Sequence, residues 1–500
     1  MIDLSRCKLK PFKHQIIGIE KLVNDPIVAL FDEMGSGKSF QVITAAQILF
    51  EQGIINKVLI IAPASVRTVW YDPDFGEIHK HLFNEFPAAI YEFHSSVRMW
   101  GNTDPKTTKL QFMISNYEFI RSSSRLEQLL PYCTNKTLLV LDESSAVKSY
   151  KAKQTIACLQ LRRACGRVVL LNGTPIANNP GDLFSQANIM DPKILGCKSY
   201  FHFRSRYAVM GGWMNKVIVQ WHDIDDIQRR LAPYVLRRLK TDCIDLPEKL
   251  DSVVMAIPMD PPTWKIYKEM KDEMVAWISE SSVSSASQAI VKAIRLAQIT
   301  SGFLGGVEEV INEDGVIEYQ PIAVKEVGRE KLDFFLSWLN DQLDVDPNIK
   351  ILVWCRFRAE VKRLYDELEI KYPKIKLGKI WGGQKREERD EALQLLNPST
   401  MPTGPVVVIG TPASGSMGLN LTGAHIVFYL SNDFSLKTRL QSEDRVHRPG
   451  QVHSVSYYDI VATGPNGQKT IDHSVVKALK NKQNLADFTT SAWLDILREN

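Results

Sequence analysis

The sequence predicts two consecutive α/β domains, each built on a parallel β-sheet flanked by helices, with helical insertions. Three observations predict this class. Short apolar runs of strand length alternate with helical patterns over residues 27–171, and the alternation resumes over residues 349–429. Polar residues follow almost every apolar run, which would gather them at the carboxyl edge of a sheet. A chain of 500 residues is also too long for a single core.

The composition is that of a soluble globular protein with no strong charge bias. Sixty-one basic and 57 acidic residues give a net charge of +4, so any nucleic-acid surface must be a local patch. The seven cysteines are scattered without a C-x-x-C pair, which argues against a zinc site and a disulfide framework and fits a reducing compartment. The N-terminus lacks the apolar core of a signal peptide, and no apolar run approaches the ~20 residues of a membrane span. We therefore expect a soluble intracellular protein.

Residues 32–39, DEMGSGKS, have the pattern of a phosphate-binding loop. They follow the apolar run 27–31 and precede a helical pattern that begins at residue 41. Lys38 would reach the β- and γ-phosphates, and the Ser39 hydroxyl would bind Mg²⁺. The first glycine of the usual pattern is replaced by Asp32, which leaves a simple helix N-terminus as the alternative. The phosphates would be surrounded by the backbone N–H groups of Met34, Gly35, Ser36 and Gly37.

Upstream of this loop, Gln15 lies in a polar stretch before an amphipathic segment. Its amide could bind an adenine edge through paired donor and acceptor contacts. A polar helix start explains the same residues equally well.

Residues 58–63, 112–117, 137–141 and 167–171 predict further buried strands, each followed by a polar loop. The strand 137–141 ends directly in Asp142 and Glu143. Two acids at the end of a buried strand are costly unless the site uses them. Asp142 would hold Mg²⁺ through water, and Glu143 would orient or deprotonate the attacking water. The alternative is a solvated acidic turn.

The middle of the chain has weaker periodicity. Residues 191–236 mix basic and aromatic side chains, which predicts a helical insertion or bridge, and a basic run at 237–240 precedes the link at 246–249. Residues 261–304 are helical in pattern, with a serine-rich break at 281–285. A β-hairpin is predicted over 307–319 and a helix over 331–339.

The second α/β region has predicted strands at 349–354, 406–411 and 424–429, and no phosphate loop. It has residues 441–451 instead. Arg445 and Arg448 are three residues apart, which predicts one face of a helix that ends at Pro449 and Gly450. Two guanidinium groups there suit the charge that develops on a transferred γ-phosphate. A solvated basic helix is the alternative, and His447 is expected to be a packing or surface residue.

These motifs, in this order, resemble those of the Swi/Snf-type ATPases of helicase superfamily 2, and most closely the compact members found in phages and bacteria. The resemblance spans nearly the whole chain. It rests on DEMGSGKS (32–39), LIIAPASVRTVW (59–70), LVLDESSAVKS (139–149), LNGTPIANNPGDLFS (171–185), LAPYVLRRLKTDCIDLPEK (231–249), GTPASGSMGLNLTGAHIVFY (410–429) and QSEDRVHRPGQ (441–451).

The resemblance implies two RecA-like lobes, residues 1–245 and 246–500, with ATP and Mg²⁺ bound in the cleft between them. Insertions would occupy about 191–236 in the first lobe and about 261–325 in the second. Lys38, Ser39, Asp142 and Glu143 would come from the first lobe, and Arg445 and Arg448 from the second. The cleft or its DNA edge would also be lined by Gly418, Asn420 and Gln441.

Duplex DNA would lie across both lobes and be held mainly through its phosphates, so that binding is salt-sensitive and largely independent of sequence. The loops concerned contain Pro63, Ser65, Tyr117, Arg356, Thr411 and Ser414.

The resemblance implies a monomeric, DNA-dependent ATPase of the bacterial or phage-infected cytoplasm that moves along double-stranded DNA and remodels DNA or protein–DNA complexes. Fork remodelling, branch migration or strand annealing is a close alternative. A non-hydrolysing DNA-binding adaptor is the alternative of another class. Two departures bear on this choice. Ser144 and Ser145 stand where remodelling enzymes carry glycine or alanine and then histidine, and Lys13 stands where the family has the glutamine, two residues before Gln15.

Overall fold

The structure is a computed structural model that describes residues 2–64, 66–73, 76–93, 108–173, 180–211, 217–243, 246–280, 286–311, 317–382, 384–416 and 420–481. The chain divides into two compact units that meet in sequence between Asp245 and Leu246. Each unit is described by itself. Within the described ranges, no helix is both long enough and apolar enough to cross a membrane.

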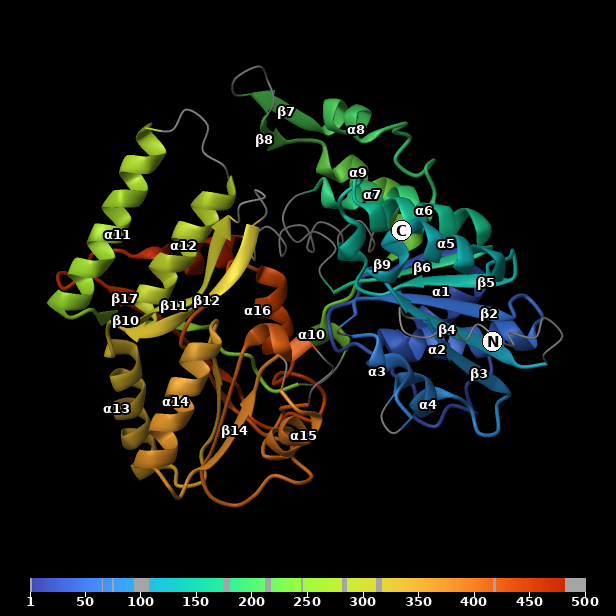
Figure 1. The fold of residues 1–500 in the computed structure, drawn as a ribbon. Coiled ribbons are helices and arrows are strands. Elements are labelled where there is room, and N and C mark those ends of the chain that lie inside the picture. Colours follow the sequence, from blue (N-terminus) through green and yellow to red (C-terminus); the bar gives the residue numbers. More distant parts are fainter. Residues whose placement is uncertain are drawn as a thin grey trace. The chain divides into compact units, whose positions relative to one another are not determined.

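Unit 1 is built on a seven-stranded parallel sheet (Figure 1). Its strands run in the spatial order β3 (Ala88–Glu92), β4 (Leu110–Asn116), β2 (Lys57–Ala62), β5 (Thr137–Leu141), β6 (Arg167–Leu171), β1 (Ile27–Leu30) and β9 (Val235–Leu236). Because all strands are parallel, the loops that follow β1, β2, β5 and β9 all lie at one edge of the sheet.

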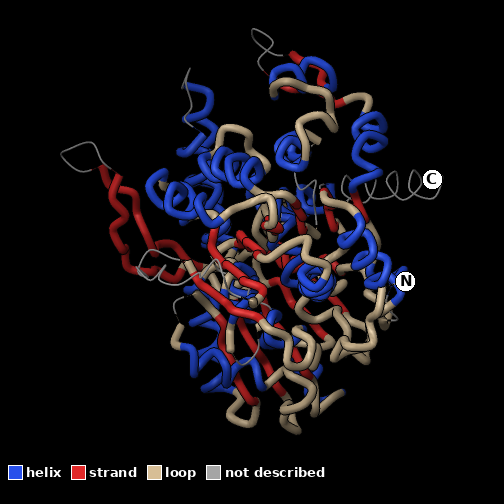
Figure 2. The backbone as a smooth tube through the Cα atoms, turned by 90° about the vertical axis from the view of Figure 1, so that its right-hand side faces the viewer, coloured by secondary structure: helices blue, strands red, loops and turns tan. Residues whose placement is uncertain are grey.

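Helices cover both faces of this sheet (Figure 1). Figure 2 draws helices in blue and strands in red. Alternate residues of one strand belong to different apolar clusters: Leu59 packs in one cluster and Ile60 in the other. Burial on both faces explains why the strands are continuous apolar runs in the sequence. The helices are α1 (Lys13–Asn24), α2 (Lys38–Glu51), α3 (Thr68–Tyr71), α4 (Glu77–His81), α5 (Ser123–Leu129), α6 (Lys153–Ala164), α7 (Asp182–Met190), α8 (Tyr200–Tyr207), α9 (Ile224–Leu231) and α10 (Lys240–Cys243).

The prediction of a helical insertion over 191–236 is only partly right. The segment contains α8 and α9, but also an antiparallel pair, β7 (Ala208–Gly211) and β8 (Val217–Trp221), and it ends in β9, which pairs with β1 in the main sheet. The periodicity is weak in the sequence because the segment changes between helix and strand within a few residues.

Unit 2 contains a six-stranded parallel sheet and an antiparallel hairpin. The sheet order is β10 (Val253–Pro258), β17 (Ser456–Thr463), β16 (Ile426–Tyr429), β13 (Lys350–Trp354), β15 (Val406–Gly410) and β14 (Lys376–Ile380). The helices are α11 (Pro261–Glu280), α12 (Ala286–Thr300), α13 (Glu330–Val345), α14 (Arg358–Lys371), α15 (Arg386–Gln394) and α16 (Leu436–Glu443).

The predicted hairpin is present as β11 (Phe303–Ile311) and β12 (Ile317–Glu326), beside α12 (Figure 1). The serine-rich residues 281–285 lie outside the described residues. Two parallel sheets flanked by helices confirm the predicted class of tandem α/β domains.

Candidate functional site

The loop between β1 and α2 has the backbone that a phosphate-binding loop requires. Gly35 and Gly37 have φ angles of +76° and +78°, in the left-handed region that side chains disfavour. A Cβ atom added at Gly37 would lie 2.3 Å from Nε2 of Gln15. Glycine is therefore needed at residue 37 for both its dihedral angles and the close approach of α1.

Lys38 and Ser39 open α2 directly after this turn. The Lys38 ammonium group donates hydrogen bonds to the carbonyl oxygens of Asp32 (2.7 Å) and Glu33 (3.0 Å), so it lies over the beginning of the loop. A helix N-terminus with an adjacent ammonium group fits an anion such as a phosphate.

Residues of α1 support the loop from behind. The Gln15 amide donates to the Ser36 carbonyl oxygen (3.2 Å), and its oxygen accepts from the Phe12 backbone N–H (3.0 Å). The His14 ring lies 2.9 Å from the same Ser36 oxygen. The structure thus places Gln15 against the phosphate loop, while its contact with adenine stays a prediction.

Asp142 and Glu143 follow β5, as predicted, and Asp142 is held by its neighbours. Its Oδ2 accepts a hydrogen bond from Trp70 Nε1 (2.8 Å), and its Oδ1 accepts one from the Glu143 backbone N–H (2.9 Å). Burial and the adjacent Glu143 raise the pKa of Asp142 to about 6, although Trp70 and the Lys38 ammonium group act in the opposite direction. The Lys38 ammonium group lowers the pKa of Asp142, and both residues follow parallel strands of one sheet, so the loop after β1 and the acidic pair after β5 lie at the same edge.

Glu143 has φ and ψ angles of 51° and 52°, in the left-handed region. A residue without glycine's freedom is strained there, and such strain is typical of functional sites. The conformation turns the chain sharply from β5 into the next short helix.

Ser144, at the first of the two departures from the family motif, is fully buried. Its hydroxyl donates to Oε1 of Gln186 in α7 (2.7 Å), and the Gln186 amide donates to the Asp182 carbonyl (2.9 Å). Ser144 therefore links the acidic pair to the helix that follows β6.

The residues at this edge fit ATP with Mg²⁺. Mg²⁺ at nucleotide sites is held by one or two side chains together with phosphate oxygens and water. Ser39 and Asp142 would be such side chains. Among the described residues, no group of three or more His, Cys, Asp or Glu side chains could hold a metal by itself, so the nucleotide would have to supply ligands.

In unit 2, the predicted helical position of the two arginines is wrong. The helix α16 ends at Glu443, and Arg445 and Arg448 lie in the turns that follow. Pro449 disfavours helical backbone at the residue before it, and Gly450 has a φ angle of +101°. The Arg445 carbonyl accepts a hydrogen bond from the Leu421 N–H (3.0 Å), which fixes this turn to the segment after β15.

The other residues expected in unit 2 are distributed around this turn. Gln441 lies in the last turn of α16 and is half-buried. The Asn420 side chain accepts from the Thr422 hydroxyl (3.0 Å). His447 is buried and its Nε2 lies 2.8 Å from the Pro247 carbonyl oxygen, in keeping with the packing role expected of it. Gly418 lies outside the described residues.

The residues predicted to contact DNA all follow strands, but most are engaged within the fold. Pro63 follows β2 and is half-buried, and Ser65 lies outside the described residues. Tyr117 is 2% exposed and its hydroxyl donates to the Asp142 carbonyl (2.8 Å), so this ring contributes to the core and to the site.

Arg356 is largely buried and its guanidinium group is 3.8 Å from Asp433. The hydroxyl groups of Thr411 and Ser414 are buried, and they bond to each other at 3.0 Å. These side chains are bonded within the fold, and the loops that contain them lie at the ends of the strands.

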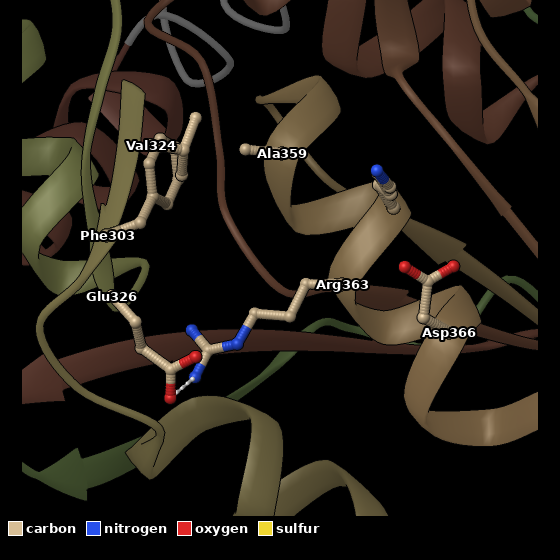
Figure 3. Close-up of a pocket in the computed structure, with 7 residues that line it drawn as sticks. Phe303, Val324, Glu326, Ala359, Arg363 and Asp366 are labelled. Atoms are coloured by element: carbon tan, nitrogen blue, oxygen red, sulfur yellow. Dashed lines mark ion pairs between the residues drawn. The ribbon is translucent and has the colours of Figure 1, made fainter. Parts of the chain in front are cut away.

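A pocket of about 340 Å³ lies in unit 2, between the hairpin β11–β12 and α14 (Figure 3). Figure 3 shows Phe303 and Val324 of the hairpin facing Ala359 of α14, and Arg363 paired with Glu326 at 2.7 Å. Its walls contain none of the predicted site residues.

Sequence reasoning missed two contacts of the candidate site. Trp70 belongs to the motif at residues 59–70, but its hydrogen bond to Asp142 depends on β2 and β5 being neighbours. Asp32 departs from the usual loop pattern, and it is fully buried and paired with Arg238 at 2.5 Å. The only sequence signal was the basic run at 237–240.

A parallel sheet with a glycine turn before α2 and an acidic pair at a nearby strand end define a nucleotide-binding protein of the phosphate-loop class. The SNF2-related domain family matches residues 24–302, and the helicase conserved C-terminal domain matches residues 331–450. The first match covers more than half of the chain, so the chain belongs to the SNF2-related family of helicase-like ATPases. The resemblance read from the motifs is confirmed.

Several known proteins are similar over most of this chain. A CHD3-type chromatin-remodeling factor of Arabidopsis thaliana is 24% identical over 91% of this chain and 35% of its own length. An uncharacterized ATP-dependent helicase of Mycoplasma pneumoniae is 26% identical over 92% of this chain and 40% of its own length. The chain thus spans little more than a third of these relatives. A solved SWI2/SNF2 ATPase core of Sulfolobus solfataricus in complex with double-stranded DNA is 22% identical, with a TM-score of 0.44 over 99% of this chain and 98% of that one.

Proposed function

We propose that this chain is a motor that hydrolyses ATP and uses the energy to move along double-stranded DNA. The observation that carries the proposal is the joint presence of Lys38 and the pair Asp142–Glu143 at one sheet edge, in a chain of the SNF2-related family. The raised pKa of Asp142 is the kind of perturbation found at functional sites.

Each residue has a separate task in this proposal. The loop N–H groups and Lys38 bind the phosphates, and Ser39 and Asp142 hold Mg²⁺. The metal, when bound, neutralises charge on the β- and γ-phosphates. Glu143 orients the attacking water and accepts its proton.

Arg445 and Arg448 supply positive charge to the γ-phosphate as it is transferred. Because they belong to unit 2 while Lys38 belongs to unit 1, hydrolysis would depend on how the two units come together on the nucleotide.

Support for DNA as the track comes from the family and from the strand-end loops. A relative over 91% of this chain bears the name of a chromatin-remodeling factor. Loops that hold phosphates would give binding that falls steeply with salt and depends little on sequence. The hydrogen bond from Ser144 to Gln186 would couple the acidic pair to α7. This contact would replace the coupling that the family makes through a histidine at the position of Ser145.

The decisive experiment is steady-state ATP hydrolysis measured without nucleic acid and with single-stranded, duplex and forked DNA. Lys38→Ala is the blank, because it removes the phosphate-binding ammonium group. We expect strong stimulation by plain duplex. A preference for the fork would favour fork or branch-migration activity instead.

Other outcomes would overturn the proposal. Stimulation by single strands alone would indicate a strand-separating helicase. DNA binding without hydrolysis under any condition would indicate a DNA-binding adaptor with an inactive ATPase fold.

A further inference from the structure

The phosphate loop of unit 1 begins with a buried ion pair. Asp32 is fully buried at the position where the usual pattern has a glycine. The Arg238 guanidinium group binds both oxygens of its carboxylate, with Nε 2.9 Å from Oδ1 and Nη2 2.5 Å from Oδ2. A buried carboxylate is costly to the fold unless such a partner is present.

Arg238 also reaches the two helices beside the loop. Its Nη1 donates to the His14 carbonyl in α1, and its Nη2 lies 3.4 Å from Oε1 of Gln41 in α2. Gly18 makes room for this arrangement, since a Cβ atom there would lie 1.7 Å from the Gln41 oxygen and 3.2 Å from Arg238 Nη2. One guanidinium group therefore joins the loop to the helices before and after it.

The backbone of the same segment is bonded to the loop as well. Leu236 accepts from the Phe31 N–H (2.8 Å), and Arg238 accepts from the Glu33 N–H (3.0 Å). The Lys240 N–H in turn donates to the Glu33 carboxylate (2.8 Å). Residues 236–240 thus extend the pairing of β9 with β1 beyond the end of both strands.

Arg237 adds a second side chain to this contact. Its guanidinium group donates to the Phe31 carbonyl and, at 2.7 Å, to the Gly173 carbonyl after β6. The first residues of the loop are therefore fixed by side chains and backbone of a segment about two hundred residues away in sequence.

The charge of Asp32 matters to any phosphate bound nearby. The Asp32 carbonyl oxygen is 2.7 Å from the Lys38 ammonium group, so this residue lies beside the group that would bind phosphate. An unpaired carboxylate here would repel a triphosphate and attract Lys38 away from it. Arg238 cancels that charge.

We propose that Arg238 is a positioning residue of the phosphate loop, which acts through Asp32 to hold the loop in its binding conformation and to keep its field favourable to phosphate. The proposal rests on the ATP-binding function proposed above. In this proposal Arg238 acts on the nucleotide only through Asp32, to which its guanidinium group is bonded. Its loss leaves Asp32 as a buried, uncompensated negative charge, and the cost falls on nucleotide affinity.

The test compares the full chain with Arg238→Gln, Asp32→Asn and the double variant. Dissociation constants for Mg-ATP, ADP and adenosine are measured by calorimetry, together with kcat and KM for hydrolysis. We expect Arg238→Gln to weaken ATP binding by roughly ten- to hundredfold, the range typical when a residue that orients a binding group is lost. The value of kcat should change less than that of KM. Because the effect is electrostatic, the loss should be larger for ATP than for adenosine.

The double variant has no buried charge at this place, so it should recover most of the ATP affinity that Arg238→Gln loses. Arg230→Gln is the matched control. It breaks an arginine–aspartate pair of the same unit, Arg230 with Asp226 at 2.9 Å, outside the phosphate loop, and should bind ATP like the unchanged chain.

Two results separate this inference from the proposed function. If the unchanged chain does not bind ATP, the proposed function is wrong. If the unchanged chain binds ATP, Lys38→Ala does not, and Arg238→Gln binds normally, the positioning role of Arg238 is wrong. Should Arg238→Gln fail to fold, Arg238→Lys replaces it. This variant keeps the charge but loses the paired contact, so an unchanged KM would equally refute the role.

Discussion

Trp70 and Asp142 are joined by a 2.8 Å hydrogen bond from the indole Nε1 to the carboxylate Oδ2. The Trp70 ring is 1% exposed, so water has little access to replace this donor. Trp70 lies in α3 after β2, and Asp142 follows β5, which pairs with β2 in the sheet. Because β2 and β5 are paired, Trp70 lies close enough to Asp142 to lower the pKa of its carboxyl group, although it is far upstream in sequence.

We predict that Trp70→Phe shifts the acidic limb of the pH–rate profile toward higher pH. The hydrogen bond lowers the pKa of Asp142, so its loss raises this pKa further above about 6. Asp142 must be ionised to hold Mg²⁺, and a larger share of it is then protonated at a given pH. A hydrogen bond to a charged group is worth roughly 1.5–3 kcal/mol, so a shift of about one pH unit or more is expected.

The measurement is kcat/KM for ATP between pH 5.5 and 8.5, which reports groups of the free enzyme. Trp338→Phe, on α13 of unit 2, is the control and should leave the limb unchanged. An acidic limb that does not move in Trp70→Phe would show that this hydrogen bond does not influence the reaction.

This contact shows where prediction from the sequence ends. The apolar runs predict the strands because burial on both faces leaves no polar positions in them. The same pattern predicts that the loop before Lys38 and the residue Asp142 lie at one edge of the sheet, because parallel strands have their carboxyl ends at the same edge. Trp70 and Arg238 could not be assigned, because their contacts depend on which strands are neighbours, and strand order is not written in local periodicity.

The prediction that Arg445 and Arg448 lie in a helix is wrong. The spacing of Arg445 and Arg448 fits a helix, but α16 stops at Glu443. The three-residue spacing predicts a helix that continues to Pro449, whereas the helix ends at Glu443. Proline restricts the backbone of Arg448 alone, so it does not account for the earlier end. The hairpin β7–β8 was missed because short strands carry too few residues to show an alternation.

Glu143 offers a prediction about strain. Its left-handed backbone costs an ordinary side chain on the order of 1–2 kcal/mol, whereas asparagine tolerates this region. We expect Glu143→Asn to be more stable than Glu143→Ala by about 1 kcal/mol in urea unfolding, while both lose hydrolysis. Glu143→Gln should lose hydrolysis and keep ATP binding. Equal stabilities of the Asn and Ala variants would contradict the strain, and turnover by Glu143→Gln would contradict the assigned role.

Arg448→Ala should abolish most hydrolysis while ATP and DNA still bind. The guanidinium group is proposed to meet charge that develops only in the transition state, so its loss should reduce kcat far more than affinity, by roughly a thousandfold or more. Steady-state kinetics and nucleotide binding are compared with Lys376→Ala, which removes an exposed cation from β14. Normal turnover in Arg448→Ala would exclude this residue from the reaction.

A charge cluster around the last turn of α16 makes unit 2 sensitive to acid. Arg439 Nε and Lys249 Nζ lie 2.5 Å and 2.6 Å from the two oxygens of Glu443, and Arg439 is also 2.5 Å from Asp459. Burial alone would raise the pKa of Glu443, but the two cations outweigh it and lower the pKa to about 2.

We therefore predict that Glu443→Gln destabilises unit 2 strongly at pH 7 and much less in acid. A carboxylate whose folded pKa lies below its unfolded value stabilises the fold above the unfolded pKa, near 4.5, and loses that contribution as the pH falls toward 2. Removing one partner of a buried pair costs roughly 3–5 kcal/mol at neutral pH. The free energy of unfolding in urea is measured at pH 7 and at pH 3.5 for the unchanged chain and for Glu443→Gln. The difference between these two proteins should be smaller at pH 3.5.

Glu269→Gln is the control, because Glu269 is exposed on α11 about 4.0 Å from Lys265. Its difference from the unchanged chain should not decrease at pH 3.5. A difference that is the same at both pH values would mean that the cluster does not hold Glu443 in its ionised form.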